Sequence, residues 1–248
     1  MEVHAHTHTQ RKKWTHYLWE FLMLFFAVFC GFLAEYKLEH IIEHNREKEY
    51  IRSMIEDAAA DTVNLNHNIM RNQRRAIGLD SLVNLCYAFD SSPQSIRQVY
   101  KLWSRYSYRP DVAILTERTI SQLKNAGGMR LIKNKAVADS ISMYDQWRDK
   151  LEEQHEWYNN AVNYTTEFAS EVLIFKYYQR NPATNKRNEV DSFPVLELLK
   201  QDKITMNMLG NRIERLKGII MYYKTLLEET DARAIRLIET MKKEYHLK

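Results

Sequence analysis

Apolar residues follow one another without interruption over the fourteen residues 21–34 (FLMLFFAVFCGFLA), near the start of the chain. A helix of that length rises only about 21 Å, less than a hydrocarbon core of about 30 Å. Aromatic residues flank the run on both sides, and a helix over 14–36 would measure roughly 33 Å. The pattern therefore predicts a membrane-spanning helix over residues 14–36. Its anchoring side chains are Trp14, Tyr17, Trp19, Phe21, Phe25, Phe29, Phe32 and Tyr36.

Two other readings of this segment stay open, a cleaved signal peptide and a buried core helix. Signal peptidase requires small residues at positions −3 and −1, and Phe32 would occupy −3 for a cut after Ala34. A lipoprotein site at Cys30 would need a small residue before it, where the chain has Phe29. These mismatches favour a retained anchor.

Basic residues set the expected orientation of the anchor. Arg11, Lys12 and Lys13 form a tight cluster just before the span, whereas the basic residues after it are spread among glutamates. Positive charge close to a span favours the cytoplasmic side. We therefore expect a single-pass membrane protein with its N-terminus in the cytoplasm and its C-terminal domain outside, which in a bacterium means the periplasm.

Beyond the span, apolar residues recur at alternating spacings of four and three, which is typical of a helix packed along one seam. The seam weakens at Thr62, Asn72 and the nearby Gly78, and the Ser92-Pro93 pair predicts the start of a short helix through about Trp103. The seam consists of Ile51, Ile55, Ala58, Thr62, Leu65, Ile69, Asn72, Ala76, Leu79, Val83 and Cys86.

The middle of the chain is less regular. We expect a helix over 111–125, a glycine corner, a long helix over 129–180 and a flexible loop over 181–194. Residues 172–175 (VLIF) have strand-like composition, but their place at the end of a helical pattern favours helix. Gly127 and Gly128 are expected to form a left-handed C-terminal cap at this corner.

A second heptad seam runs along the C-terminal helix, through Leu209, Ile213, Leu216, Ile220, Tyr223, Leu227, Thr230, Ala234, Leu237 and Met241. Two such seams predict antiparallel partners within one bundle, while pairing with a second copy of the chain is the alternative. The predicted fold class is all-α: one N-terminal transmembrane helix, followed over 37–248 by an elongated antiparallel helical bundle with coiled-coil-like seams.

The composition is consistent with long helices and gives little support to a nucleic-acid-binding or a disulfide-rich protein. The chain of 248 residues has only 6 Gly and 4 Pro, and its net charge is +4. Arg71, Arg74 and Arg75 form a small basic patch, which we interpret as a solvated helix face, and the chain lacks the concentrated basic surface of a nucleic-acid binder. Two cysteines, Cys30 and Cys86, give no disulfide framework.

Histidines supply the candidate chemistry. His40, Glu43 and His44 match the H-x-x-E-H pattern of a zinc-dependent hydrolase, in which histidines four apart share a metal. A solvated helix just beyond the span is the favoured reading, so metal binding or metal-dependent hydrolysis at 40–44 is kept as the alternative. The polar tail 1–13 is rich in histidine (HAHTH at 4–8) and could bind metals such as Zn or Ni. No cofactor is predicted.

Two stretches carry a resemblance. The segment WEFLMLFFAVFCGFLAEYKLEHIIEHNREKEYIRSMIED and the segment TISQLKNAGGMRLIKNKAVADSISMYD are similar to the start and the central motif of a group of uncharacterised single-span membrane proteins of Bacteroidota. Together they cover about a quarter of the chain. The resemblance implies a bacterial envelope protein, with the span in the inner membrane. It also implies that Gly127, Gly128, Leu131, Ile132 and Asn134 form a structural corner, with glycine for backbone freedom, Leu131 and Ile132 for packing and Asn134 for a cap. No catalytic residues follow from it.

The sequence thus predicts a membrane-anchored, non-enzymatic helical module for sensing, scaffolding or protein–protein interaction. The expected partners are the lipid bilayer and either another envelope protein or a second copy of the chain, with no nucleic acid.

Overall fold

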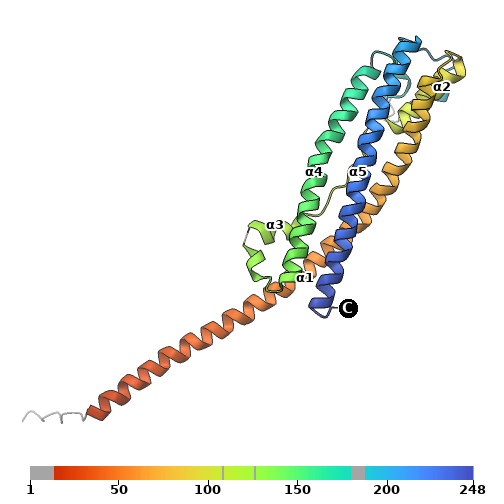
Figure 1. Ribbon diagram of the computed structural model, residues 1–248. Coiled ribbons are helices and arrows are strands. Elements are labelled where there is room, and N and C mark those ends of the chain that lie inside the picture. The colour runs from red at the N-terminus through yellow and green to blue at the C-terminus, as the bar shows by residue number, and fades with distance from the viewer. Residues whose placement is uncertain (1–13, 108, 126, 180–187, 248) are drawn as a thin grey trace, which may run out of the picture. The chain divides into compact units, whose positions relative to one another are not determined.

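The computed structural model describes residues 14–107, 109–125, 127–179 and 188–247 (Figure 1). The fold is all-α, as the periodicity predicts. Five α-helices occur in the described residues: α1 (Trp14–Tyr87), α2 (Pro93–Tyr106), α3 (Arg118–Asn125), α4 (Lys135–Ala169) and α5 (Lys203–Glu244). The chain divides into two compact units, residues 1–50 and residues 51–248.

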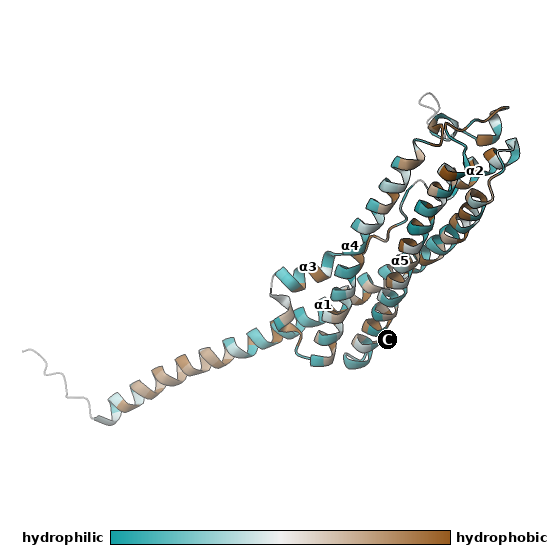
Figure 2. Cartoon of the chain, turned by 45° about the horizontal axis from the view of Figure 1, so that its top comes forward, coloured by the Kyte–Doolittle hydropathy of each residue, from teal (hydrophilic) through white to brown (hydrophobic). Residues whose placement is uncertain are grey.

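In the first unit, α1 contains the apolar stretch over residues 21–34, visible as the brown part of this helix in Figure 2. By length and composition, α1 is the one helix in the described part of the chain that could cross a membrane, and its apolar window has no buried residue. The predicted anchor residues from Trp14 to Tyr36 are exposed, which is the arrangement that a lipid-facing helix requires.

In the second unit, residues 51–87 of α1 pack with α4 and α5 around one apolar core. The α5 helix runs antiparallel to α1, because Tyr87 donates a hydrogen bond to Asn211 while Asn66 donates one to Asp231 further along α5. All ten predicted residues of the α5 seam are buried, and so are eight of the eleven in the α1 seam. The two seams are therefore antiparallel partners within one chain.

The short helix α2 begins as predicted. Ser92 is its N-cap and accepts a hydrogen bond from the Ser95 amide, and Pro93 occupies the first helical position. The helix continues to Tyr106, and its Trp103 is fully buried and donates to the Tyr178 hydroxyl at 2.8 Å.

The helix predicted over 111–125 begins only at Arg118. Residues 109–117, here called the strap, have no regular secondary structure. Their backbone groups are bound by side chains of α1, α4 and α5 instead of by each other, which removes the advantage of forming a helix.

The helix predicted over 129–180 is also too long. A 3₁₀ turn spans Gly128–Leu131, α4 spans Lys135–Ala169, and a second 3₁₀ turn spans Phe175–Tyr177. Residues 172–174 of the VLIF segment are not helical, and Leu173 pairs with Leu198 in an isolated antiparallel bridge. Burial of Val172 and Leu173 in the core accounts for its strand-like composition.

The predicted flexible loop is described only in part. Residues 181–187 lie outside the described residues, and a 3₁₀ turn spans Val190–Ser192. Arg97 on α2 donates to the carbonyls of Val190 and Phe193 at 3.1 and 2.9 Å, which ties the end of this segment to the bundle. Mobility of the loop stays a prediction.

Gly78 allows α2 to approach α1 closely. A Cβ atom at this position would lie 2.3 Å from Cδ2 of Tyr106 and 2.4 Å from Cγ of the same ring, so the whole side chain would have to move. We expect Gly78→Ala to lower the free energy of unfolding by about 1–3 kcal/mol, because the clash exceeds the gain in helix propensity. Urea denaturation of the full-length protein in mild detergent, followed by circular dichroism, measures this.

Gly218 on α5 is the matched control for this substitution. A Cβ atom there meets nothing within 4 Å, so Gly218→Ala should raise stability by about 0.5–1 kcal/mol through helix propensity alone. Equal effects at the two glycines would contradict the packing explanation.

Candidate functional site

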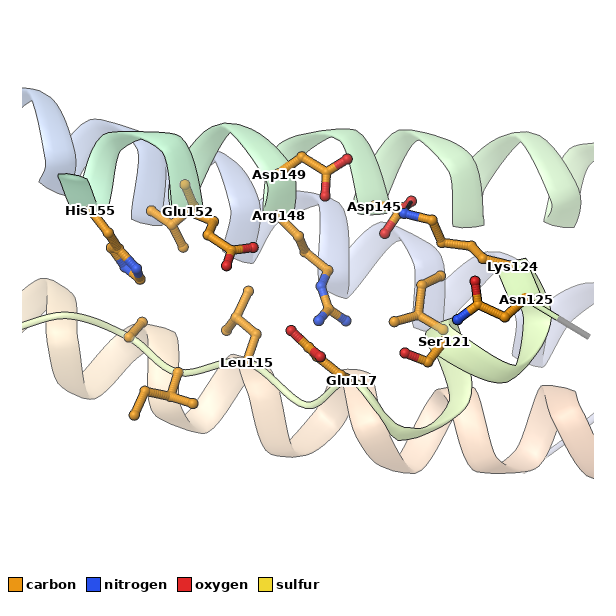
Figure 3. Close-up of a pocket in the computed structure, with 14 residues that line it drawn as sticks. Leu115, Glu117, Ser121, Lys124, Asn125, Asp145, Arg148, Asp149, Glu152 and His155 are labelled. Atoms are coloured by element: carbon orange, nitrogen blue, oxygen red, sulfur yellow. Dashed lines mark ion pairs between the residues drawn. The ribbon is translucent and has the colours of Figure 1, made fainter. Parts of the chain in front are cut away.

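The first candidate site is a pocket between the strap, α3 and the middle of α4, with a volume of about 490 Å³ (Figure 3). From α4, Arg148, Glu152 and His155 point toward the strap. The lining residues are Ala113, Ile114, Leu115, Glu117, Ile120, Ser121, Lys124, Asn125, Asp145, Arg148, Asp149, Leu151, Glu152 and His155.

One end of the strap is held by Arg75, which is buried in the bundle with 3% exposure. Its guanidinium donates to the carbonyls of Tyr106 at 2.6 Å and Ser107 at 3.2 Å, and to the carbonyl of Arg109. It also donates to the Tyr158 hydroxyl at 2.8 Å. A single side chain of α1 thus satisfies three carbonyls between α2 and the strap.

The other end of the strap is held by two carboxylates of α1. Asp61 accepts the Thr116 amide at 2.7 Å and the Tyr144 hydroxyl at 2.7 Å. Asp57 accepts both the amide and the hydroxyl of Thr119, at 3.0 and 2.6 Å. Since Thr119 lies in the first turn of α3, Asp57 acts as a cap supplied by another helix.

Two buried tyrosine hydroxyls take part in the hydrogen bonds around the strap, although neither tyrosine lines the pocket. Tyr223 of α5 accepts the Ala113 amide at 3.0 Å and lies 2.5 Å from Nε2 of His155. Tyr158 donates to the Asn72 side chain at 2.9 Å. Burial raises the pKa of Tyr223, and it raises the pKa of Tyr158 to about 12, so both hydroxyls stay neutral.

The pocket carries more acidic than basic groups. Four carboxylates line it, against Lys124 and Arg148. Lys124 pairs with Asp145 at 2.8 Å, and Arg148 donates to the Thr116 carbonyl at 2.6 Å, so both cations have structural partners. What remains is a cavity rich in hydrogen-bond acceptors, which suits a polar or cationic group.

His155 gives the bundle a specific pH dependence. Burial lowers the pKa of His155, and the nearby Glu152 opposes the shift only in part. As the pH falls below about 6.5, His155 takes up a proton in the unfolded chain before it does so in the folded chain. The folded state therefore loses stability as the pH falls through the lowered pKa of His155. Chemical denaturation from pH 7 to pH 5 should show a steeper loss of stability for the parent chain than for His155→Gln. Identical slopes would contradict the burial effect.

The predicted glycine corner lies next to this pocket in the sequence. Gly127 adopts the left-handed conformation with φ of 67°, and Asn134 is the N-cap of α4, accepting the Val137 amide at 3.3 Å. Gly128 and Ile132 are buried, and Leu131 is half-buried. None of the five corner residues lines the pocket, so the corner shapes the chain between α3 and α4.

The H-x-x-E-H motif lies on α1 in the first unit. Nδ1 of His40 is 3.7 Å from Glu43, and Nδ1 of His44 is 3.5 Å from Glu47, so each imidazole faces the glutamate three residues later. Among the described residues, no three His, Cys, Asp or Glu side chains are grouped as a metal site. The histidine-rich tail 1–13 lies outside the described residues.

Sequence reasoning missed most of the polar residues that build this site. Asp57, Asp61, Asn68, Asn72 and Arg75 follow the buried side of α1 at spacings of four, seven, four and three. That spacing is the signal that could have found them, because it puts all five on one helix face. The interpretation of Arg75 as part of a solvated basic patch is wrong, whereas Arg71 and Arg74 are exposed.

A different surface lies on the outer side of α1. Val63, Met70 and Ile77 are 72%, 56% and 59% exposed and recur every seven residues, so they form one apolar line along the helix. This outer apolar line lies away from the seam residues, which pack into the core.

No protein-family model, no curated protein and no solved structure matches the chain.

Proposed function

We propose that the chain is a membrane-anchored, non-enzymatic helical module of a bacterial envelope that binds a protein partner, in a sensing or scaffolding role. The observation that carries this proposal is the outer apolar line of Val63, Met70 and Ile77. Exposed apolar residues aligned on one helix face are typical of a surface that another helix covers.

The continuity of α1 supports the membrane part of the proposal. The same helix contains the exposed apolar segment near its N-terminus and, from Ile51 onward, the first seam of the bundle. The partner would therefore be found at a membrane, either as another envelope protein or as a second copy of the chain.

The use of the polar residues supports a role without catalysis. Four groups whose pKa is clearly shifted by burial belong to the hydrogen-bond network around the strap: Arg75, Tyr144, Tyr158 and Tyr223. Their hydrogen bonds go to backbone groups, to one another and to the side chains of Asp61, Asn72 and His155, which is a structural use. His155 has the Tyr223 hydroxyl as its neighbour, and the carboxylates around it suit binding of a polar group.

The orientation follows from Arg11, Lys12 and Lys13, which would keep the N-terminus in the cytoplasm and the bundle in the periplasm. Single cysteines at Thr7 and at the exposed Ser142 test this in a Cys30→Ala background. Cys86 can stay, because it is buried and its pKa is raised to about 12 by burial. A membrane-impermeant maleimide on intact cells should label position 142 and not position 7. The reverse pattern would put the bundle in the cytoplasm.

Site-specific photo-crosslinking in native membranes tests the partner. A photoreactive amino acid at Met70 should capture a protein in a defined complex, while the same amino acid at Arg236, which is exposed on α5, should not. Crosslinks between two copies would identify self-association, and a heterologous product would identify another envelope protein. Equal capture at the two positions, or none at Met70 together with a monomeric purified chain, would refute the proposal.

A further inference from the structure

A second pocket, of about 570 Å³, lies between α1, the C-terminal turn of α2 and the start of the strap. Five arginines reach it, three from α1, one from α2 and one from the strap. Its lining consists of Arg71, Arg74, Arg75, Arg105 and Arg109 together with Ile77, Ser104, Tyr106 and Asp111. We call it the arginine pocket.

The arginines in this pocket have different roles. Arg71 forms an ion pair with Asp111, the single carboxylate among the described lining residues. Arg75 gives its N–H groups to carbonyls and to Tyr158, so it adds a fixed buried charge behind the pocket. Arg74 and Arg105 are exposed, and their guanidinium groups come from two different helices.

Such a concentration of one charge is costly when the pocket holds only water, because the guanidinium groups repel one another. An anion with two charges relieves that repulsion. The planar fork of N–H donors on each guanidinium matches the oxygens of a phosphate group, and two such forks can bind one phosphate from different sides.

One wall of the pocket is formed by the side chains of Ile77 and Tyr106, while Ser104 and Asp111 complete the lining. Ile77 is 59% exposed, and the Tyr106 ring lies against the backbone of α1 at Gly78. An apolar or aromatic part of a ligand can pack on this wall while its phosphate meets the arginines. The volume also lies within the range of small-molecule sites.

We propose that the arginine pocket binds a small phosphate ester whose organic part is apolar or aromatic. Arg74 and Arg105 contact the phosphate, Arg71 and Arg75 supply the surrounding positive field, and Ile77 and Tyr106 contact the organic part. This site does not depend on the partner-binding role of α1, although Ile77 belongs to both surfaces.

Isothermal titration calorimetry with phenyl phosphate tests the site in the full-length chain, held in nanodiscs of neutral phosphatidylcholine. Saturable binding with one site per chain is expected. The double variant Arg74→Ala, Arg105→Ala should weaken it at least about tenfold, because each lost charge-assisted contact is worth that factor or more. Arg74→Lys with Arg105→Lys should retain part of the affinity, since the charge stays while the fork is lost.

Arg236→Ala removes an exposed arginine elsewhere on the bundle and is the matched control, with unchanged affinity expected. No saturable binding, equal binding by the double variant, or stronger binding of a short single-stranded oligonucleotide than of phenyl phosphate would overturn the proposal. Thermal unfolding of each variant separates lost binding from lost folding.

Nanodiscs that contain phosphatidylglycerol identify the source of the phosphate. Unchanged binding of phenyl phosphate supports a soluble ester as the ligand. If phenyl phosphate binds in neutral nanodiscs but not in those that contain phosphatidylglycerol, the lipid headgroup competes for the same arginines. That result would overturn the proposal of a soluble ester and assign the arginines to a lipid headgroup.

Discussion

Replacing Arg75 with methionine is expected to lower the free energy of unfolding by about 3–4 kcal/mol, among the largest effects of a single change in this chain. The substitution keeps an unbranched side chain but leaves the carbonyls of Tyr106, Ser107 and Arg109 without their donor. Removing a buried charge recovers part of its desolvation cost, which keeps the effect below the sum of the lost bonds. Urea denaturation of the full-length protein in mild detergent measures it.

The neighbouring Arg74 is the control for Arg75. It is exposed, so Arg74→Ala should change stability by less than about 0.5 kcal/mol. The loss of stability for Arg75→Lys should lie between those for Arg75→Met and Arg74→Ala. An ammonium group keeps the charge but cannot bind three carbonyls at once as the planar guanidinium does. A tolerated Arg75→Met would mean that water replaces the guanidinium.

Replacing Asp57 with alanine should cost about 2–4 kcal/mol. The carboxylate accepts two hydrogen bonds from Thr119 and one from Arg118 at 2.7 Å, and the Thr119 amide and hydroxyl would be left buried without an acceptor. The ion pair itself contributes little, since Arg118 is more than half exposed. The same denaturation experiment applies, with hydrogen exchange at the start of α3 as a local measure.

The adjacent Glu56 provides the control for Asp57. It also approaches Arg118, at 3.4 Å, but it is 71% exposed, so Glu56→Ala should be nearly neutral. Asp57→Asn should lose about half as much stability as Asp57→Ala, because the amide oxygen can still accept from Thr119 without the charge. Similar losses for Glu56→Ala and Asp57→Ala would assign the effect to surface charge.

Local pattern was sufficient to predict the long helices. The seams of α1 and α5 repeat over many turns, so the helical period stands out, and the Ser92-Pro93 pair marks the start of α2 by its chemistry alone. The antiparallel arrangement of α1 and α5 also follows from the two seams.

The strap and the pocket could not be predicted in this way. The conformation of residues 109–117 depends on side chains far away in sequence: Asp61 lies 55 residues from Thr116, and Arg75 lies 34 residues from Arg109. The sequence around 111–125 has no such information, so the prediction extended the helix to residue 111. His155 and Arg148 formed no motif, because their partners come from α5 and the strap.

The hydrogen bonds to the strap restrict which mutations this segment can accept during evolution. Side chains of α1 bind main-chain groups of the strap and of the start of α3, and the two segments run in opposite directions. Asp57 binds the Thr119 amide at one end, and Arg75 binds the Arg109 carbonyl at the other. Inserting or deleting one residue between these ends would misalign the partners, so the length of the connection is constrained. The side chains of Ile114 and Glu117, however, point into solvent or the pocket and make no demand on that alignment. Substitutions there can alter what the pocket accepts while the bundle keeps its fold.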